Sequence, residues 1–133
     1  MAKGEITIFH NPSCGTSRNV LAAIRAAGKE PKVVEYLKAG WTEAQLRDLF
    51  QRMGVKPRDL LRVRGTPAED LGLTKPGVAD AAIVRAMARE PILVERPIVV
   101  TRKGVALCRP AEPALRDGNA EFAGFTRKLL EDA

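Results

Sequence analysis

The chain has few of the residues that build metal centres and disulfide frameworks. Its 133 residues include one histidine and two cysteines, Cys14 and Cys108, which lie far apart in the sequence. No Cys-x-x-Cys pair and no Cys/His cluster with the spacing of zinc ligands is present. We therefore expect no bound metal. We also expect both thiols to remain reduced, as is typical of a cytoplasmic protein.

Long apolar runs are also missing, and aromatic residues make up only 5% of the chain. No segment is long and apolar enough to cross a bilayer, and the N-terminus lacks the charged, apolar and small-residue pattern of a secretory signal. The formal net charge is +6. The basic residues are scattered among acidic ones, which together with the scarcity of aromatics argues against a nucleic-acid partner. We expect neither a membrane nor a nucleic-acid partner.

The hydrophobic pattern predicts a single α/β domain over residues 1–133. Gly28 is suited to close the first helix as a left-handed cap, and Thr42 and Gln45 have the spacing of a capping box that opens another. The expected elements, in chain order, are a strand over 5–9, a helix from Cys14 to about 27, a strand over 32–36, a helix from about 42 to 54, short helices between about 56 and 91, a hairpin of strands over 98–101 and 105–108, and a helix from about 119 to 131.

This order of elements matches the thioredoxin-like fold, with a four-stranded mixed sheet flanked by helices. The segment at about 56–91 would be an inserted, all-helical part. In that fold a redox cysteine stands at the start of the first helix, and an X-Pro bond just before the third strand is usually cis. Cys14 and the Arg96-Pro97 bond occupy these two places, so we expect a cis peptide bond at Pro97.

Cys14 lies in a predicted turn between a strand and a helix. A sulfur at that place is near the unpaired N–H groups and the positive end of the helix dipole, which lower the pKa of a thiol. Its neighbours Gly15, Thr16 and Ser17 are small or hydroxylated, whereas a cysteine that only packs in a core usually has apolar neighbours. Both interpretations remain open, but the position favours a nucleophilic thiol.

Other polar side chains near Cys14 have two interpretations each. His10 is the only histidine and precedes Cys14 by four residues, and a lone histidine is more often structural than catalytic. Thr16 and Ser17 can donate hydrogen bonds to the sulfur or to a bound anion, but helix capping explains them equally well. Cys108 falls in a predicted strand, and we interpret it as a packing residue rather than a resolving thiol.

Four separated blocks of the sequence together resemble the glutaredoxin-coupled arsenate reductases of bacteria. The similarity extends from Ile6 to about Glu112, which is most of the chain. The blocks are His10-Asn-Pro-Ser-Cys-Gly-Thr-Ser-Arg-Asn19, Leu60-Leu-Arg62, Pro91-Ile-Leu-Val-Glu-Arg-Pro-Ile-Val-Val100 and Leu107-Cys-Arg-Pro110.

The resemblance implies that Cys14 is the nucleophile and that Arg62, Arg96 and Arg109 bind the oxyanion. It further implies arsenate as substrate, glutathione as co-substrate, glutaredoxin as partner and no bound cofactor. In this family the histidine that matches His10 tunes the cysteine rather than acting as an essential base. A thiolate that attacks arsenate meets like-charge repulsion, which guanidinium groups cancel while binding the oxyanion in a bidentate fashion.

The residues alone support the three arginines unequally. Arg96 stands at the head of one predicted strand and Arg109 at the end of another, so both can lie at the end of the sheet that faces Cys14. Arg62 rests mainly on the resemblance, because its neighbours Arg58 and Arg64 are equally basic. Any of the three arginines can also be an ordinary surface residue.

Two other functions stay open on the sequence. Spx-type regulators share this fold and bind RNA polymerase, but they typically carry a Cys-x-x-Cys switch where this chain has Ser17. A family relative could also use the same thiol on another substrate with glutathione. Since no second cysteine lies near Cys14, electrons would have to come from outside the chain. We expect a monomer, because no coiled-coil heptads are present.

Overall fold

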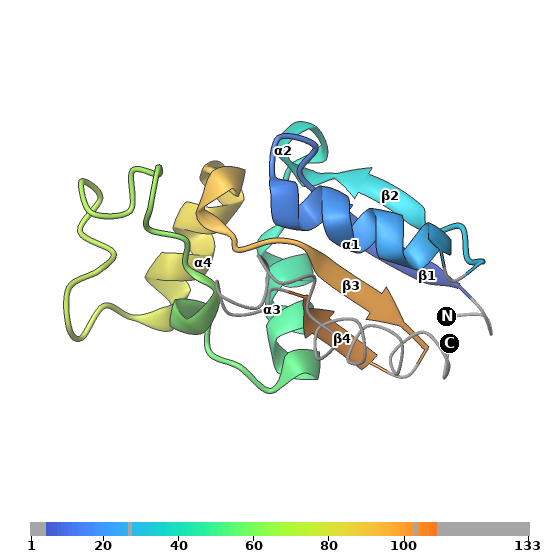
Figure 1. The fold of residues 1–133 in the computed structure, drawn as a ribbon. Helices are drawn as coiled ribbons and strands as arrows, with labels where there is room; N and C mark the ends of the chain where they lie inside the picture. Colours follow the sequence, from blue (N-terminus) through green and yellow to red (C-terminus); the bar gives the residue numbers. More distant parts are fainter. Residues whose placement is uncertain (1–4, 27, 103, 109–133) are drawn as a thin grey trace. The chain divides into compact units, whose positions relative to one another are not determined.

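The computed structural model describes residues 5–26, 28–102 and 104–108, which divide into two compact units (Figure 1). The first unit comprises residues 1–35 and 96–133, and the second comprises 36–95. The elements of the first unit are β1 (Ile6–His10), α1 (Gly15–Ala26), β2 (Lys32–Glu35), β3 (Ile98–Thr101) and β4 (Gly104–Leu107). The elements of the second unit are α2 (Tyr36–Ala39), α3 (Glu43–Met53), the 3-10 helix η1 (Pro57–Leu60), α4 (Asp80–Arg89) and the 3-10 helix η2 (Pro91–Leu93).

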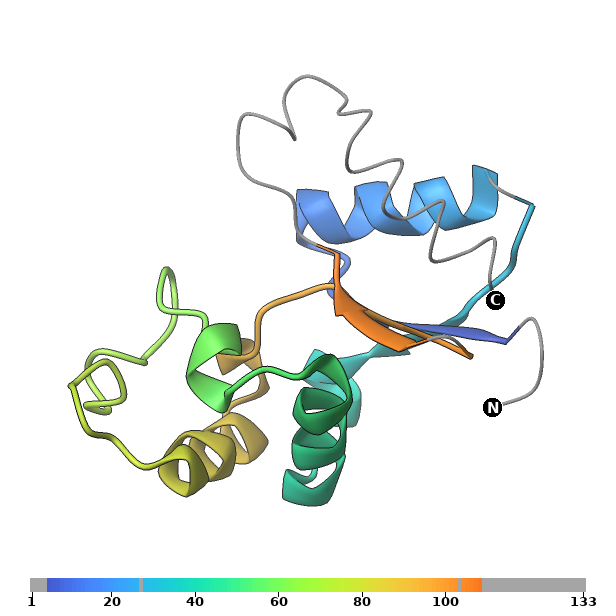
Figure 2. The ribbon, with the colours of Figure 1, turned by 90° about the horizontal axis from the view of Figure 1, so that it is seen from below.

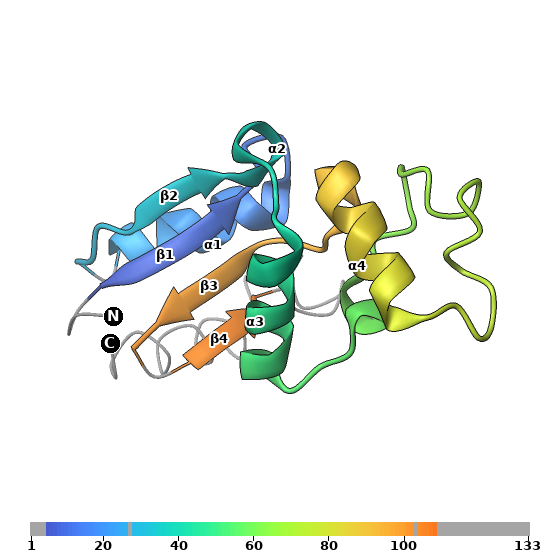
Figure 3. The ribbon, with the colours of Figure 1, turned by 180° about the vertical axis from the view of Figure 1, so that it is seen from behind.

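The four strands form one mixed sheet, as the sequence predicted, and the structure gives their order as β2-β1-β3-β4 (Figure 3). β1 and β2 are parallel, and α1 connects them. β3 is antiparallel to both β1 and β4. The expected hairpin is also present, with Ile98 opposite Leu107 and Thr101 opposite Gly104.

Helix α1 lies along one face of the sheet (Figure 2). Its residues Val20 and Ile24, four positions apart, are fully buried and pack with Ile8 of β1 and Val99 of β3. The helix ends as predicted at Gly28, whose φ of 82° is accessible to glycine without strain. The N–H groups of Gly28 and of the next residue bond back to carbonyls of the last turn, as in a Schellman cap.

The second unit is helical, and the start and end of α3 follow the sequence signals. The Thr42 side chain accepts a hydrogen bond from the Gln45 N–H at 3.1 Å, and Gly54 closes the helix with a φ of 70°. α4 packs against α3, η1 and η2. The core positions of these four helices are Leu46, Leu49, Phe50, Leu60, Ile83, Val84, Met87 and Leu93. No helix within the described ranges is long and apolar enough to span a membrane.

Several predicted boundaries were wrong. β1 spans Ile6–His10 rather than 5–9, because His10 still pairs with Glu35 of β2. β2 ends at Glu35, and Tyr36 instead begins the unpredicted helix α2, from which its ring stacks on Trp41 with 5.4 Å between centroids. β4 ends at Leu107, so Cys108 follows the strand.

Of three further expectations, one lies within the described residues and two lie outside them. The segment predicted as short helices over about 56–91 contains η1, α4 and η2, with turns between η1 and α4. The predicted helix at about 119–131 and the site residue Arg109 lie outside the described residues.

Candidate active site

Cys14 occupies the N-cap position of α1. Its carbonyl accepts the first hydrogen bond of the helix from the Arg18 N–H at 3.0 Å, and its own N–H donates to the Asn11 carbonyl at 3.0 Å. The residue is 8% exposed. At an N-cap, a side-chain acceptor can receive hydrogen bonds from the unpaired N–H groups of the first turn. The Cys14 sulfur thus starts from the position at which an Asp or Ser side chain usually caps a helix.

The loop that carries Cys14 is fixed by a buried hydrogen-bond network around Ser17. The Ser17 Oγ accepts from the Asn11 N–H at 3.0 Å and lies 2.6 Å from Nδ1 of His10. All three residues are buried. Since His10 ends β1 and Ser17 lies in the first turn of α1, this network ties the strand to the helix on either side of Cys14.

Two more hydrogen bonds close the loop itself. The Asn11 Oδ1 accepts from the Ser13 N–H at 2.9 Å, and the Arg18 guanidinium donates through Nη1 to the Pro12 carbonyl at 2.8 Å. Asn11 belongs to this loop network and was not among the residues that the sequence singled out. Its signal was present, because asparagine before Pro-Ser commonly bonds to the backbone two residues later.

The pKa of His10 is lowered from its ordinary value of 6.5, chiefly because burial disfavours the charged imidazolium. The carboxylate of Glu35, opposite His10 in the sheet, raises the pKa, whereas Arg25 and Arg18 lower it. The net effect keeps His10 neutral near pH 7. A neutral imidazole can share a single proton with the Ser17 hydroxyl, which suits the short separation of Nδ1 and Oγ.

The register of the sheet brings Arg96 to the same end as the Cys14 loop. β1 runs toward that end, and Phe9 pairs with Ile98, the first residue of β3. Arg96 lies two residues before the start of β3, is buried, and joins Pro97 through the expected cis peptide bond. The Pro97 carbonyl accepts a hydrogen bond from the Cys108 N–H at 3.0 Å, so the end of β4 lies there too.

Of the remaining predicted site residues, Thr16 is buried in the first turn of α1. Arg62 belongs to the second unit, where its Nη1 lies 3.4 Å from a carboxylate oxygen of Glu95. Its neighbours are placed differently, because Arg58 and Arg64 are exposed and Arg58 donates to the Lys75 carbonyl. The sequence did not predict a role for Glu95, because its partner Arg62 lies 33 residues away in the chain.

Cys108 differs from Cys14 in its surroundings. It is 1% exposed and packs with Ile6, Ile8 and Val99 in the core of the first unit. Burial raises the pKa of the Cys108 thiol to about 12. A thiol that stays protonated is a poor nucleophile, which agrees with a packing role.

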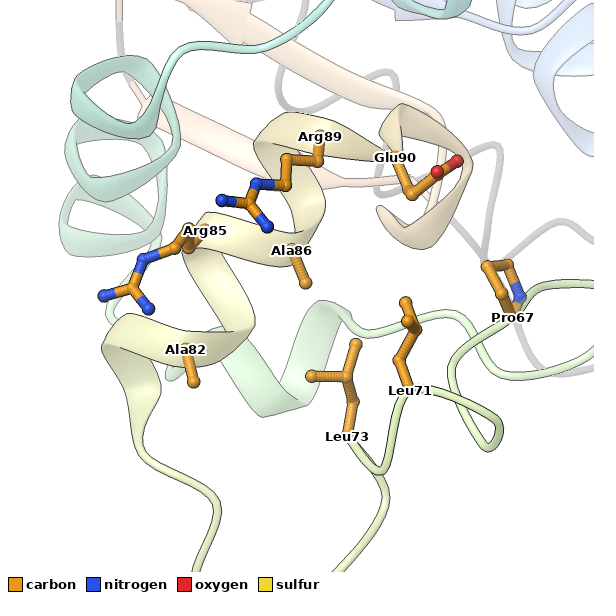
Figure 4. A pocket seen from close by; sticks show the side chains of 8 residues that line it. All are labelled: Pro67, Leu71, Leu73, Ala82, Arg85, Ala86, Arg89 and Glu90. Atoms are coloured by element: carbon orange, nitrogen blue, oxygen red, sulfur yellow. The ribbon is translucent and has the colours of Figure 1, made fainter.

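The second unit contains a pocket of about 400 Å³ that none of the predicted site residues lines (Figure 4). Leu71, Leu73, Ala82 and Ala86 supply apolar walls, and the pocket holds no nucleophile. The Arg85 and Arg89 side chains run to one side of α4, whereas Glu90 points away from them. Among the described residues, no group of three or more His, Cys, Asp or Glu side chains is arranged to hold a metal ion.

Known proteins resemble this chain over most of its length. Residues 9–116 match the ArsC family. An "Arsenate reductase ArsI1" of Synechocystis sp. is 54% identical over 115 residues, covering 86% of this chain and 80% of that protein. The "Arsenate reductase" of Escherichia coli strain K12 is 47% identical over 110 residues, covering 83% and 78%.

Solved structures give the same result for the fold. An "Arsenate reductase from Vibrio cholerae" superposes with a TM-score of 0.77 at 34% identity, covering 86% of this chain and 98% of that one. A "Putative arsenate reductase from Yersinia pestis" superposes with a TM-score of 0.75 at 37% identity, covering 84% and 99%. The predicted thioredoxin-like fold is thereby confirmed. With a family match over residues 9–116, this chain belongs to the ArsC family.

Proposed function

We propose that this protein reduces arsenate to arsenite, with Cys14 as the nucleophile. The observation that carries the proposal is the placement of Cys14 at the N-cap of α1, in a loop held by the His10–Ser17 network. Relatives that are named arsenate reductases support the choice of substrate. About half of their aligned residues are identical to this chain, over more than four fifths of its length.

In the first step the Cys14 thiolate attacks arsenic(V), an As–O bond breaks, and water leaves after protonation. The product is a covalent Cys14–arsenate adduct, and arsenic keeps its oxidation state. The incoming oxyanion is bound by Arg62, Arg96 and Arg109, whose guanidinium groups offset the repulsion between thiolate and anion. Thr16 and Ser17 lie in the first turn of the helix that Cys14 caps. Backbone N–H groups in that turn can donate hydrogen bonds to the bound anion.

In the second step glutathione thiolate attacks the adduct. Arsenic gains two electrons and leaves as arsenite, while the two thiols lose two electrons and join as a Cys14–glutathione disulfide. Glutaredoxin then reduces this mixed disulfide by thiol exchange. An external thiol fits the chain, because Cys108 is buried in the core with a raised pKa. We further propose that the protein works as a cytoplasmic monomer without a bound cofactor.

An assay that couples glutathione, glutaredoxin and glutathione reductase to NADPH oxidation tests this function. Wild-type protein should consume NADPH only when arsenate is present. Cys14→Ser should abolish turnover with an unchanged circular dichroism spectrum, and Cys108→Ser serves as the matched control that retains turnover. NADPH consumption without arsenate indicates another substrate. Absence of turnover together with capture of RNA polymerase indicates the regulator instead.

A further inference from the structure

The ion pair between Arg62 and Glu95 differs from others in this protein by its burial. Both side chains are 18% exposed. Three further ion pairs of the described residues have side chains that are 41–71% exposed, namely Arg25–Glu30, Arg47–Glu43 and Arg52–Asp48. Water and salt screen an exposed pair strongly and a partly buried pair much less. Among these four pairs of described residues, the Arg62–Glu95 pair is therefore the one that solvent screens least.

The backbone on both sides of the pair is also fixed. Leu61 and Val94 form an antiparallel bridge, with the Arg62 N–H donating to the Leu93 carbonyl at 2.7 Å and the Glu95 N–H donating to the Leu60 carbonyl at 2.9 Å. Side chains alternate across such a ladder, so Arg62 and Glu95 project on the same face as diagonal neighbours. The ladder thus places the two charged groups within reach of each other.

The contact engages one end of the guanidinium. Glu95 accepts a hydrogen bond from Nη1, at 3.4 Å. The edge formed by Nε–H and Nη2–H makes no hydrogen bond to any residue in the described ranges. This edge carries two parallel N–H donors, the arrangement that binds an oxyanion in a bidentate fashion.

We propose that Glu95 is a positioning residue for Arg62: it holds the guanidinium through Nη1 and presents the Nε–Nη2 edge to the arsenate oxyanion. This inference rests on the proposed function. An unrestrained arginine has many rotamers, and fixing one of them before the substrate arrives lowers the entropic cost of binding. Glu95 also directly precedes Arg96 in the chain, so one short segment supplies an oxyanion-binding arginine and the residue that orients another.

The test compares steady-state constants for arsenate in the coupled assay. Glu95→Ala should raise KM by about tenfold while kcat changes less than about twofold, since binding is impaired and the attack by Cys14 is not. Glu95→Gln keeps an oxygen acceptor of the same shape and should raise KM less. Glu43→Ala removes the carboxylate of the exposed Arg47 pair and should leave both constants unchanged.

A double-mutant cycle separates positioning from general stability. In the Arg62→Ala background, Glu95→Ala should have no further effect on KM, because the guanidinium that Glu95 positions is gone.

Four outcomes would contradict parts of this account. An equal rise of KM in both backgrounds, or no rise with Glu95→Ala alone, overturns the proposal for Glu95, while arsenate turnover by the wild type still supports the function. If Arg62→Ala leaves KM unchanged, the oxyanion role of Arg62 fails together with this inference. If the wild type does not reduce arsenate, the proposed function itself fails.

Discussion

Ser17 Oγ and His10 Nδ1 lie 2.6 Å apart, and this contact joins the end of β1 to the first turn of α1. The serine oxygen also accepts the N–H of Asn11, the first residue of the loop that leads to Cys14. A single buried hydroxyl thus satisfies a backbone donor and an imidazole at once. The position of the thiol depends on this serine, although Ser17 lies three residues beyond it.

Replacing Ser17 by alanine should destabilise the protein and reduce turnover. The change leaves the buried Asn11 N–H and His10 Nδ1 without their partner, which costs about 1–3 kcal/mol of unfolding free energy. Urea denaturation measures this loss. Ser13→Ala is the matched control, because the Ser13 side chain is exposed and its N–H keeps the bond to Asn11. Equal stability of the two variants would contradict the role assigned to Ser17.

Stability should fall in mild acid because of His10. Its pKa is below 6.5 in the folded protein, chiefly through burial, and about 6.5 in the unfolded chain. The unfolded chain therefore binds the proton more readily. The contribution of neutral His10 to the unfolding free energy is complete above pH 6.5 and is lost as the pH falls through the folded pKa. Urea unfolding at pH 7.5, 6.5 and 5.5 measures the slope. His10→Asn, which cannot titrate, should flatten it, and an unaltered slope in that variant counts against this explanation.

Cys108 should resist alkylation in the folded protein. Burial raises its pKa to about 12, against an ordinary value of 9.0. At pH 8.5, iodoacetamide should modify Cys14 and spare Cys108, as peptide mass spectrometry can show, whereas both thiols should react in denaturant. Comparable labelling of the two cysteines in the native protein would rule this out.

The raised pKa of Cys108 also predicts that the protein loses stability at alkaline pH. Because the folded protein holds the Cys108 proton more tightly than the unfolded chain, the unfolding free energy decreases as the pH rises above 9 toward 12. Cys108→Val has no proton to lose and should show a shallower decline. Denaturation curves at pH 8, 9 and 10 for both proteins measure the difference, and parallel declines would contradict the assignment.

Gly54 and Gly104 should respond oppositely to alanine. A Cβ meets no atom within 4 Å at either position, but Gly54 has a φ of 70° whereas Gly104 does not lie in the left-handed region. Gly54→Ala should therefore cost about 1–2 kcal/mol of unfolding free energy through backbone strain alone. Gly104→Ala should be neutral or slightly stabilising, since it restricts the unfolded chain. Thermal melts of the two variants check the contrast.

The sequence by itself determined the elements whose signals are local. Val20 and Ile24 repeat at helical spacing, Gly28 and Gly54 end helices with a left-handed conformation, and Thr42 caps the start of α3. Each signal acts over a few residues, through backbone sterics or a single hydrogen bond, and is therefore visible in the letters. The order of these elements, with Cys14 between the first strand and the first helix, was enough to predict the mixed sheet.

Only the tertiary structure decided which distant side chains act together. Arg58, Arg62 and Arg64 are equivalent in sequence, but only Arg62 is half-buried with its Nη1 against Glu95. For Cys108 the sequence already favoured a packing role, but only the structure gave its burial and the raised pKa that follows from it. Such properties depend on solvent exclusion and on contacts between segments more than 30 residues apart, and no local pattern encodes them.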